Sequence, residues 1–210
     1  MKLLDKKIID LFVTHVSDVR LDEPMSKHTT FRLGGLARLY AVATSSEQLL
    51  QAVEVALELE IPWVVIGGGT NILVADEGFE GVVIQAVHQT MQVEGALVTV
   101  ESGAISALVA RKTVEVGLTG FEWAVGLPGT LGGAMYGDAG CYGGEMRDAV
   151  TTVDVYDVAR HERRQLTNKE CRFDYRDSIF KHERFVILGC VLGFEQTTDV
   201  GASRAKMDAI

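Results

Sequence analysis

Apolar residues are spaced along the first half of the chain for short helices that alternate with strands. Their helical spacing predicts a helix over Leu4–Val16, followed by a polar connector that runs to Lys27. Continuous apolar runs predict strands over Ala37–Val42 and Trp63–Ile66, with a helix over Leu49–Leu59 between them. The order strand, helix, strand is typical of a small α/β unit.

The second half of the chain is patterned for strands that surround one helix. In chain order, the pattern predicts a turn at Asp76–Gly81, a strand at Val82–Ile84 and a hairpin of Met91–Val93 and Leu97–Glu101. A helix is predicted at Ile105–Val116, and it ends at Gly117. Strands are predicted at Ala149–Tyr156 and Phe185–Phe194 on either side of a charged segment, Arg160–Arg172, and a helical piece is predicted at Ala202–Ile210.

Glycine clusters in one stretch, Gly120–Gly144, and ten of the 22 glycines lie between Gly117 and Gly144. Glycine costs backbone entropy, so such clustering indicates a need for positive φ or for close backbone approach. The stretch also contains aromatic and aliphatic residues, so it is packed and does not behave as a flexible linker. We interpret it as a backbone surface shaped for a large, flat, phosphate-bearing ligand.

Composition narrows the classes of function. The hydrophobic content of 47% is ample for a globular core, and the net charge of −9, without a Lys/Arg cluster, argues against nucleic-acid binding. Three cysteines without Cys-x-x-Cys spacing argue against a disulfide framework and a zinc site, and they fit a reducing compartment. Charges interrupt the N-terminus too early for a secretory signal, and apolar runs are too short or too broken for a membrane span. We therefore expect a cytoplasmic protein.

Two glycine-containing segments are candidates for holding phosphate. Gly67–Asn71 follows an apolar strand, where backbone amides can surround a pyrophosphate, although it matches neither a P-loop nor a dinucleotide-binding fingerprint. The alternative is a tight turn. In Gly126–Ala134, Thr130 can offer a hydroxyl and an amide at a helix start, and the alternative is close packing without a ligand. Ser102–Ala104, at a strand end, is a further candidate for amide contacts.

The segment Tyr175–Lys181 contains one arginine with two possible roles. Arg176 lies between Asp174 and Asp177, and the local sequence favours a surface ion pair that contributes little. The alternative is a guanidinium presented to a carboxylate or phosphate of a ligand. The five histidines lack ligand-like spacing, and we interpret them as structural or solvated.

Four motifs in this order resemble those of the UDP-N-acetylenolpyruvoylglucosamine reductase family. They are Thr30–Gly35, Ile66–Val74 with Asp76-Glu77-Gly78-Phe79, Gly126–Gly143, and Tyr175–Lys181, and together they extend over nearly the whole chain. The resemblance implies an α+β, two-lobed FAD-binding fold of the vanillyl-alcohol-oxidase (PCMH) type. It implies lobes at residues 1–88 and 89–200, with residues 201–210 as the start of a truncated substrate-binding domain.

The resemblance also implies a reaction and a set of site residues. Members of this family use noncovalent FAD and NADPH to reduce UDP-N-acetylglucosamine enolpyruvate to UDP-N-acetylmuramate for peptidoglycan synthesis, which implies a UDP-sugar and NADPH as partners, no nucleic acid or membrane, and a monomer. Arg176 would be catalytic, and Tyr175 and Arg176 would bind substrate. The residues that would bind the cofactor are Gly67, Gly68, Gly69, Thr70, Asn71, Gly103, Leu127, Pro128, Gly129, Thr130, Gly133, Ala139 and Gly140.

The chain departs from this family in two places. Asp138 and Cys141 stand where the family more often has asparagine and alanine, and the family's Gly-Ser-x-Phe-Lys-Asn-Pro motif, which carries the proton-donor serine, is missing together with a late glutamate. We therefore expect these 210 residues to bind FAD weakly or not at all and not to turn over. The alternatives are an FAD-binding protein without turnover and another flavin oxidoreductase of the same fold.

Overall fold

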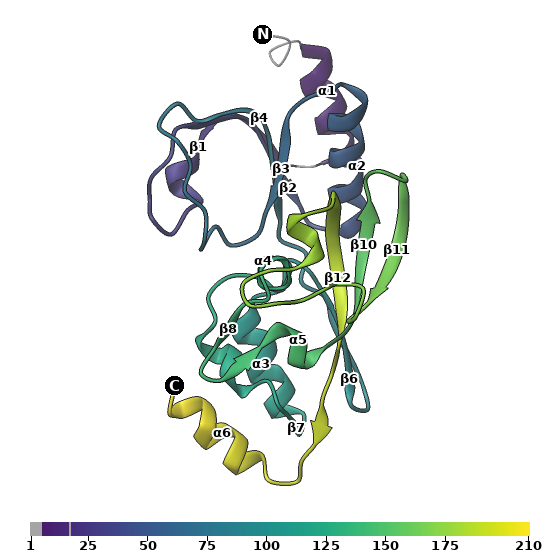
Figure 1. Cartoon of the computed structure of the whole chain (residues 1–210). Helices are drawn as coiled ribbons and strands as arrows, with labels where there is room; N and C mark the ends of the chain where they lie inside the picture. Colours follow the sequence, from purple (N-terminus) through teal and green to yellow (C-terminus); the bar gives the residue numbers. More distant parts are fainter. Residues whose placement is uncertain (1–5, 17) are drawn as a thin grey trace. The chain divides into compact units, whose positions relative to one another are not determined.

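The computed structural model describes residues 6–16 and 18–210, with side chains from Ile8 onward, and divides into two compact units (Figure 1). The first unit ends at His88 and the second comprises Gln89–Ile210. Residues 4 and 5 of the helix predicted over Leu4–Val16 lie outside the described residues, and the described part of that helix is α1, Lys6–His15.

A four-stranded sheet forms the centre of the first unit, in the order β1-β2-β4-β3. β1 is antiparallel to β2, whereas β2 and β3 are both parallel to β4. The elements are α1 (Lys6–His15), β1 (Asp18–Pro24), η2 (Met25–Lys27), β2 (Leu36–Ala43), α2 (Ser46–Glu58), β3 (Trp63–Ile66) and β4 (Phe79–Ala86).

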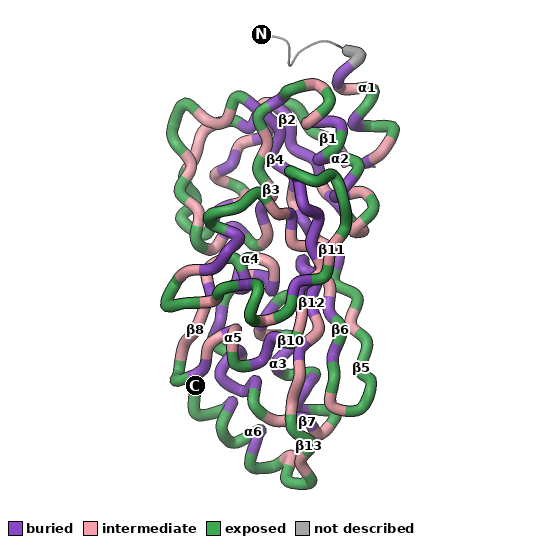
Figure 2. The backbone as a smooth tube through the Cα atoms, turned by 45° about the vertical axis from the view of Figure 1, so that its right-hand side comes forward, coloured by how far each residue is buried: buried purple, intermediate pink, exposed green. Residues whose placement is uncertain are grey.

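Helix α2 provides the crossover that places β3 in the same sheet as β2. The Ser45 side chain accepts a hydrogen bond from Gln48 N at 3.1 Å, which caps the helix start, so α2 begins at Ser46 rather than at Leu49. The residues Leu39, Ala41 and Ala43 alternate along β2 and are fully buried. Figure 2 shows the buried positions concentrated along β2 and β4.

The other face of this sheet lies under loops. Tyr40 of β2 and Val83 of β4 pack with Met25, and Ile72 and Val74 from the segment after β3 pack against the same cluster. These loops include the glycine segment Gly67–Asn71, which therefore lies over this face of the sheet.

The polar connector predicted before Lys27 is wrong. Its residues form the edge strand β1 and the short helix η2. An edge strand pairs along one side only and is less buried than a central strand, so a polar sequence such as that of β1 is compatible with pairing. The turn predicted at Asp76–Gly81 is shorter than expected, because β4 begins at Phe79.

A five-stranded antiparallel sheet, in the order β11-β10-β12-β6-β5, forms the second unit together with several helices. Two short pairs, β7 with β13 and β8 with β9, accompany it. The elements are β5 (Met91–Glu94), β6 (Leu97–Glu101), α3 (Ser106–Glu115), β7 (Leu118–Thr119), η3 (Glu122–Gly126), α4 (Leu131–Tyr136), β8 (Gly140–Cys141), β9 (Gly144–Glu145), α5 (Met146–Ala149), β10 (Val150–Asp157), β11 (Glu162–Thr167), η4 (Ile179–Lys181), β12 (Phe185–Gly193), β13 (Glu195–Gln196) and α6 (Val200–Asp208).

Two predictions for the second unit need correction. The charged segment Arg160–Arg172 contains the edge strand β11, in which Leu166 is buried among exposed and partly exposed polar residues. The final helix begins at Val200 rather than Ala202, because Asp199 caps it by accepting a hydrogen bond from Ala202 N at 2.9 Å. The predicted hairpin and the helix ended by Gly117, which has φ +78°, are confirmed.

A buried carboxylate connects α6 to the rest of the second unit. Glu122 is 6% exposed, and its Oε1 accepts hydrogen bonds from the Ser203 and Thr119 hydroxyls, both at 2.6 Å. Its Oε2 accepts from Gly120 N at 2.8 Å. Burial raises the pKa of the Glu122 carboxyl, but the hydrogen bonds from Ser203, Thr119 and the backbone outweigh burial and lower the pKa to about 2.

Replacing Glu122 by glutamine is expected to lower the free energy of unfolding at neutral pH by about 2 kcal/mol, because a neutral amide makes weaker hydrogen bonds with Ser203, Thr119 and Gly120 N than the carboxylate does. Since the folded pKa is depressed, the carboxylate stabilises the fold above pH 4.5, and this contribution is lost as the pH falls toward 2. Urea denaturation across this range measures the difference between the two proteins. Glu115→Gln, at an exposed residue that pairs with Lys112, is the control. A difference between wild type and Glu122→Gln that stays constant down to the lowest pH would contradict this role.

Candidate functional site

The segment Gly67–Asn71 continues directly from β3 and is shaped by glycine. Gly69 has φ +64°, and a Cβ built there would lie 1.9 Å from the carbonyl oxygen of His28. Thr30 N donates to Gly69 O at 3.0 Å, which fixes the segment against the preceding loop. Within the described part of the chain, the backbone amides of residues 68–71 donate no hydrogen bond. The predicted cradle therefore presents free amides, which suit an anionic group.

The second unit joins the Ser102–Ala104 segment to the glycine-rich stretch through backbone hydrogen bonds. Leu131 N donates to Ala104 O at 2.9 Å, and Gly132 N donates to Ser102 O at 2.8 Å. A Cβ at Gly132 would lie 2.9 Å from Ser102 Cβ, so this glycine serves close packing. The predicted residues Gly103, Gly129 and Thr130 are thereby brought to one place within this unit.

Helix α4 starts after Thr130, as the sequence predicts, but the threonine side chain makes no capping hydrogen bond. Thr130 is 8% exposed, and a Cβ at Gly133 would have the Thr130 hydroxyl oxygen as its nearest neighbour, at 3.8 Å. There is space beside Gly133, in contrast to Gly132. Of the other predicted residues, Leu127 is in the hydrophobic core and Pro128 is exposed.

Arg176 occupies a tight turn that projects its side chain toward another predicted segment. Asp174 and Asp177 exchange both backbone hydrogen bonds, which leaves Tyr175 and Arg176 as the turn residues. Arg176 has φ +55°, a conformation that favours glycine. Its Nη2 donates to Gly140 O at 2.9 Å, so the structure places Arg176 beside the predicted cofactor residues Ala139 and Gly140.

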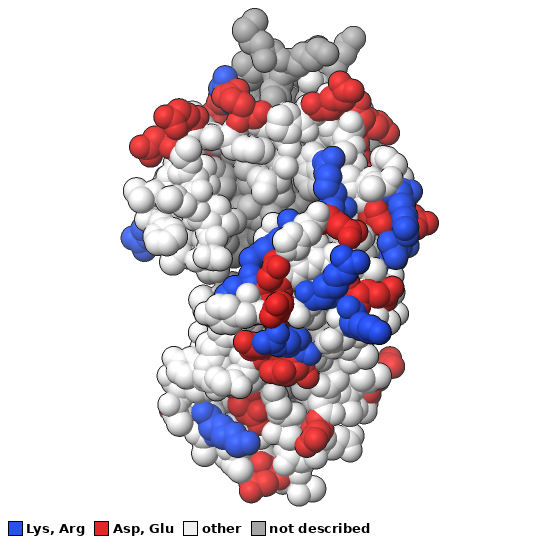
Figure 3. All heavy atoms as spheres, viewed as in Figure 1, with Lys and Arg blue, Asp and Glu red and all other residues white. Residues whose placement is uncertain are grey.

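The prediction from the local sequence that Arg176 forms a surface ion pair is wrong. Asp177 instead pairs with His182 at 2.9 Å, and Asp174 lies 3.8 Å from Arg147. Figure 3 shows basic and acidic side chains intermingled on the face in view, as such pairs require. Among the described residues, no carboxylate forms an ion pair with Arg176, whose guanidinium lies 5.9 Å from the exposed Tyr175 ring.

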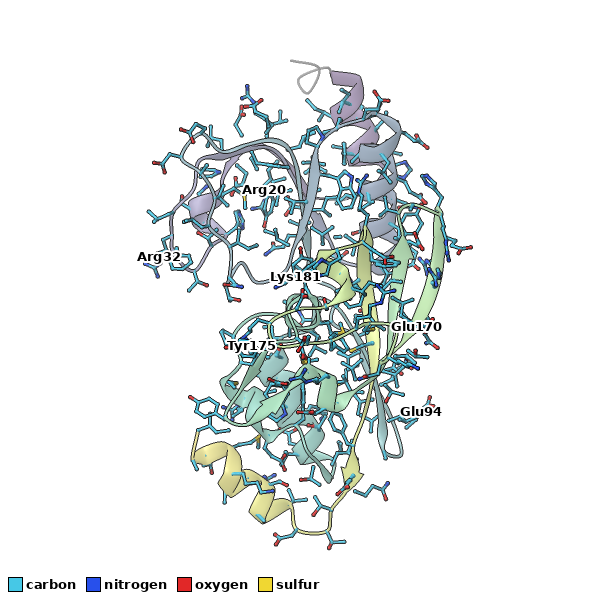
Figure 4. All side chains as sticks on the ribbon, viewed as in Figure 1. Arg20, Arg32, Glu94, Glu170, Tyr175 and Lys181 are labelled. Atoms are coloured by element: carbon cyan, nitrogen blue, oxygen red, sulfur yellow. The ribbon has the colours of Figure 1, made fainter. Side chains whose placement is uncertain are left out.

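Lys181 and Ser178 also fix this turn, and sequence reasoning did not single them out. Lys181 Nζ donates to Arg176 O, and the buried Ser178 hydroxyl donates to Tyr136 O at 2.7 Å. Tyr175 and Lys181 are labelled in Figure 4. The Ser178 oxygen also accepts from Phe180 N at 3.3 Å, so the serine preceding an apolar pair was a detectable cap signal for η4.

The two departures from the family pattern have structural partners. Asp138 is 1% exposed with φ +40°, and its Oδ1 accepts from Arg147 N at 2.9 Å. Burial raises the pKa of the Asp138 carboxyl, while the hydrogen bond from Arg147 opposes this increase. The Cys141 thiol donates to Trp123 O at 3.4 Å. Asp138 therefore faces Arg147, whose Nε lies 3.5 Å from Asp138 Oδ2.

The described residues contain no group of three or more His, Cys, Asp or Glu side chains arranged for a metal ion. No helix in the described part of the chain is both long and apolar enough to cross a bilayer.

The chain is similar to an FAD-binding domain family and to one group of reductases. A family profile described as "FAD binding domain" matches residues 37–164. Curated UDP-N-acetylenolpyruvoylglucosamine reductases are similar to the chain: that of Caldicellulosiruptor bescii is 38% identical over 182 residues (85% of this chain, 58% of the relative), and that of Geobacillus thermodenitrificans is 36% identical over 192 residues (91% and 62%). The chain spans less than two thirds of the length of these relatives.

Two solved structures are also similar to the chain. The UDP-N-acetylenolpyruvylglucosamine reductase of Thermus caldophilus has a TM-score of 0.76 at 28% identity, over 91% of this chain and 66% of that one. An alkyldihydroxyacetonephosphate synthase, at 14% identity, has a TM-score of 0.66 over 90% of this chain and 40% of that one, which shows a shared fold. The expected α+β fold of the PCMH type is confirmed. The chain belongs to the FAD-binding domain family.

Proposed function

We propose that this chain is the FAD-binding part of an NADPH-dependent UDP-N-acetylenolpyruvoylglucosamine reductase. The observation that carries the proposal is the arrangement of Arg176, which is held on a tight turn beside Gly140 and free of carboxylate partners among the described residues. The relatives that bear this name support the assignment, with 38% identity to the Caldicellulosiruptor bescii protein over 85% of this chain.

The residues present fit FAD. A cofactor with a pyrophosphate requires several donors without bulky side chains, and the amides of residues 68–71 supply them. The space beside Gly133 and the Thr130 hydroxyl, which makes no capping hydrogen bond, suit a further part of such a molecule. We propose Gly67–Asn71, Gly103, Leu127–Thr130, Gly133, Ala139 and Gly140 as the cofactor residues.

When bound, FAD supplies the transfer of hydride from NADPH to the enolpyruvyl group. We propose that Arg176 stabilises the negative charge that develops on the substrate carboxylate, since a positioned cation interacts more strongly with the transition state than with the ground state. Tyr175, which is 74% exposed on the same turn, is available for contact with the substrate. The three free thiols fit a reducing compartment, and we propose the cytoplasm.

Titration with FAD of the protein that carries this chain tests the cofactor assignment. Binding is expected to shift the visible flavin spectrum and to quench flavin fluorescence, with an affinity that weakens when the segment Gly67–Asn71 is altered. The reductase assignment is tested separately by NADPH oxidation that depends on UDP-N-acetylglucosamine enolpyruvate, in the protein that carries this chain. An unchanged spectrum at saturating FAD contradicts the first assignment. Bound flavin that the enolpyruvyl substrate cannot reoxidise contradicts the second.

A further inference from the structure

A continuous series of side-chain hydrogen bonds extends from Glu23 to the glycine segment of the first unit. Glu23 Oε1 lies 2.9 Å from His28 Nε2, and His28 Nδ1 lies 2.9 Å from the Tyr40 hydroxyl. The Tyr40 hydroxyl contacts Gln85 Oε1 at 2.7 Å, and Gln85 Nε2 donates to Gly67 O at 3.3 Å. We call Glu23, His28, Tyr40 and Gln85 the relay.

The backbone explains why the relay residues meet. β2 and β4 are adjacent parallel strands in which Tyr40 is opposite Val83, so Tyr40 and Gln85 project from the same face of the sheet. Tyr40 is fully buried, and its ring stacks on the His28 ring with centroids 4.1 Å apart. The relay therefore lies in the interior beneath the loops, where an unmade hydrogen bond is costly.

The hydrogen bond between Gln85 and the Gly67 carbonyl fixes the direction of the other hydrogen bonds in the relay. A backbone carbonyl only accepts, so the Gln85 amide nitrogen faces Gly67 and its oxygen faces Tyr40. The Tyr40 hydroxyl must then donate to Gln85, and burial raises the pKa of Tyr40, which keeps the hydroxyl protonated. Since the single Tyr40 hydrogen is already used, His28 Nδ1 must carry a proton and donate to the hydroxyl oxygen.

The hydrogen bond between His28 Nε2 and Glu23 Oε1 also needs a proton. With Nδ1 protonated, a neutral His28 would turn the Nε2 lone pair toward the Glu23 oxygen, and a hydrogen bond there needs a second proton. The hydrogen bond from His28, the largest influence, holds the pKa of Glu23 below its usual value. With Glu23 ionised, every hydrogen bond of the relay is made only when both ring nitrogens of His28 carry a proton.

The other charges near this pair are two cations, Lys27 and Arg20, and one anion, Asp18, all of the same unit. Lys27 Nζ lies 3.6 Å and Arg20 Nη1 lies 3.7 Å from Glu23 Oε1. Arg20 mainly pairs with Asp18, through hydrogen bonds of 2.9 and 2.5 Å, and its guanidinium lies 5.8 Å from the Tyr40 ring centre. Figure 4 labels Arg20 in this unit. Lys27 and Arg20 favour the ionised form of Glu23 and lower its pKa.

The glycine segment depends on the relay at two points. Gln85 holds the carbonyl of Gly67, and the backbone carbonyl of His28 lies where a Cβ of Gly69 would be. Thr30, two residues after His28, donates its backbone N–H to Gly69 O. A change in the His28 ring or in the Gln85 amide therefore acts on the backbone that presents the free amides.

We propose that the relay carries one extra proton between Glu23 and His28 and positions the segment Gly67–Asn71, so that the affinity for the cofactor pyrophosphate falls as the proton is lost. The dependence on a cofactor rests on the proposed function, whereas the protonation of the relay does not. The relay residues are positioning residues, since they act through the backbone of the glycine segment.

Loss of the proton breaks the relay at a defined bond. A neutral His28 keeps its hydrogen on Nε2, facing the Glu23 carboxylate, and Nδ1 becomes an acceptor. The Tyr40 hydroxyl then donates to His28, and the Gln85 oxygen loses its donor. The Gln85 amide is no longer fixed, which loosens its hold on Gly67 O. We expect FAD affinity to fall on the order of ten-fold, equivalent to one lost hydrogen bond.

Heteronuclear NMR of the chain without FAD tests the proton. Between pH ~5 and ~9, both ring nitrogens of His28 are expected to be protonated at low pH and only Nε2 at high pH. The amide resonances of Gly67 and Gly69 should shift with the same midpoint. A His28 that stays neutral over the whole range would falsify the proposal.

Glu23→Gln separates the proton from the shape of the relay. A glutamine amide can donate to the Nε2 lone pair of neutral His28, so the relay is complete without the extra proton. FAD affinity is then expected to equal that of the wild type at low pH and to be independent of pH, as are the Gly67 and Gly69 amide shifts. Tyr40→Phe, which breaks the relay, should weaken binding about ten-fold at low pH and remove the pH dependence.

Matched controls leave the relay intact. Tyr156→Phe removes a hydroxyl that lies 3.5 Å from His161 Nδ1 in the second unit, and Glu80→Gln alters an exposed partner of Arg38. Both should keep the wild-type pH profile. Equal pH dependence in wild type and Glu23→Gln overturns the proposal. If no variant binds FAD, the cofactor assignment fails, and the NMR midpoints of His28 and the two glycine amides still decide whether the relay acts on the segment.

Discussion

Replacing Arg176 by alanine is expected to slow reoxidation of the flavin by the enolpyruvyl substrate by about 100-fold or more, because a positioned cation is removed from a developing carboxylate charge. Reduction of the flavin by NADPH should change much less, since that step places no charge on the substrate carboxylate. Stopped-flow absorbance of the two half-reactions, in the protein that carries this chain, measures the difference.

Arg172→Ala is a matched control for this experiment. Arg172 is another arginine with positive φ, at +47°, but its exposed side chain lies 3.7 Å from Glu183. Its replacement should leave both half-reactions unchanged. Equal losses in the two half-reactions of Arg176→Ala would count against the assigned role, because they would indicate general damage to the site.

Replacing Gly69 by alanine is expected to weaken FAD binding roughly 100-fold, or about 2.7 kcal/mol. The new Cβ would lie 1.9 Å from the carbonyl oxygen of His28, so one of the two backbone segments must move. Backbone atoms cannot rotate away as a flexible side chain can, and the free amides of the segment would lose their arrangement. Flavin fluorescence titration measures the affinity, and circular dichroism verifies that the variant is folded.

Gly95→Ala separates this collision from backbone strain. Gly95 has φ +62°, close to that of Gly69, but a Cβ there meets no atom within 4 Å. The variant should lose about 1 kcal/mol of stability and keep the FAD affinity. If Gly69→Ala lowers stability to the same extent as Gly95→Ala and binds FAD as tightly as the wild type, the segment does not hold the cofactor.

Elements with strong local signals could be predicted from the sequence. Ser45 marks the start of α2, and the positive φ of Gly117 ends α3, because these residues act through their own neighbours in the chain. The strands β1 and β11 could not be found in this way. Both are polar edge strands, and their pairing depends on strands elsewhere in the sequence.

The site residues also divide into those that local sequence identifies and those that depend on contacts distant in the sequence. The glycine segments were identifiable because their composition is locally unusual. The partner of Arg176 was not, because the two neighbouring aspartates pair with His182 and Arg147 and leave the guanidinium to Gly140 O, 36 residues away. The relay was also beyond sequence analysis, since Tyr40 and Gln85 are 45 residues apart and meet only through strand pairing.

The turn that carries Arg176 has a consequence for the evolution of stability. A side chain at φ +55° raises the free energy of the folded state by on the order of 1 kcal/mol relative to a residue that favours this conformation. Glycine or asparagine at this position would therefore be preferred by selection for stability alone. In return, the guanidinium is already ordered before any ligand arrives, so its conformational entropy is lost on folding rather than on binding. Stabilising substitutions at this turn should thus be the ones that sacrifice recognition.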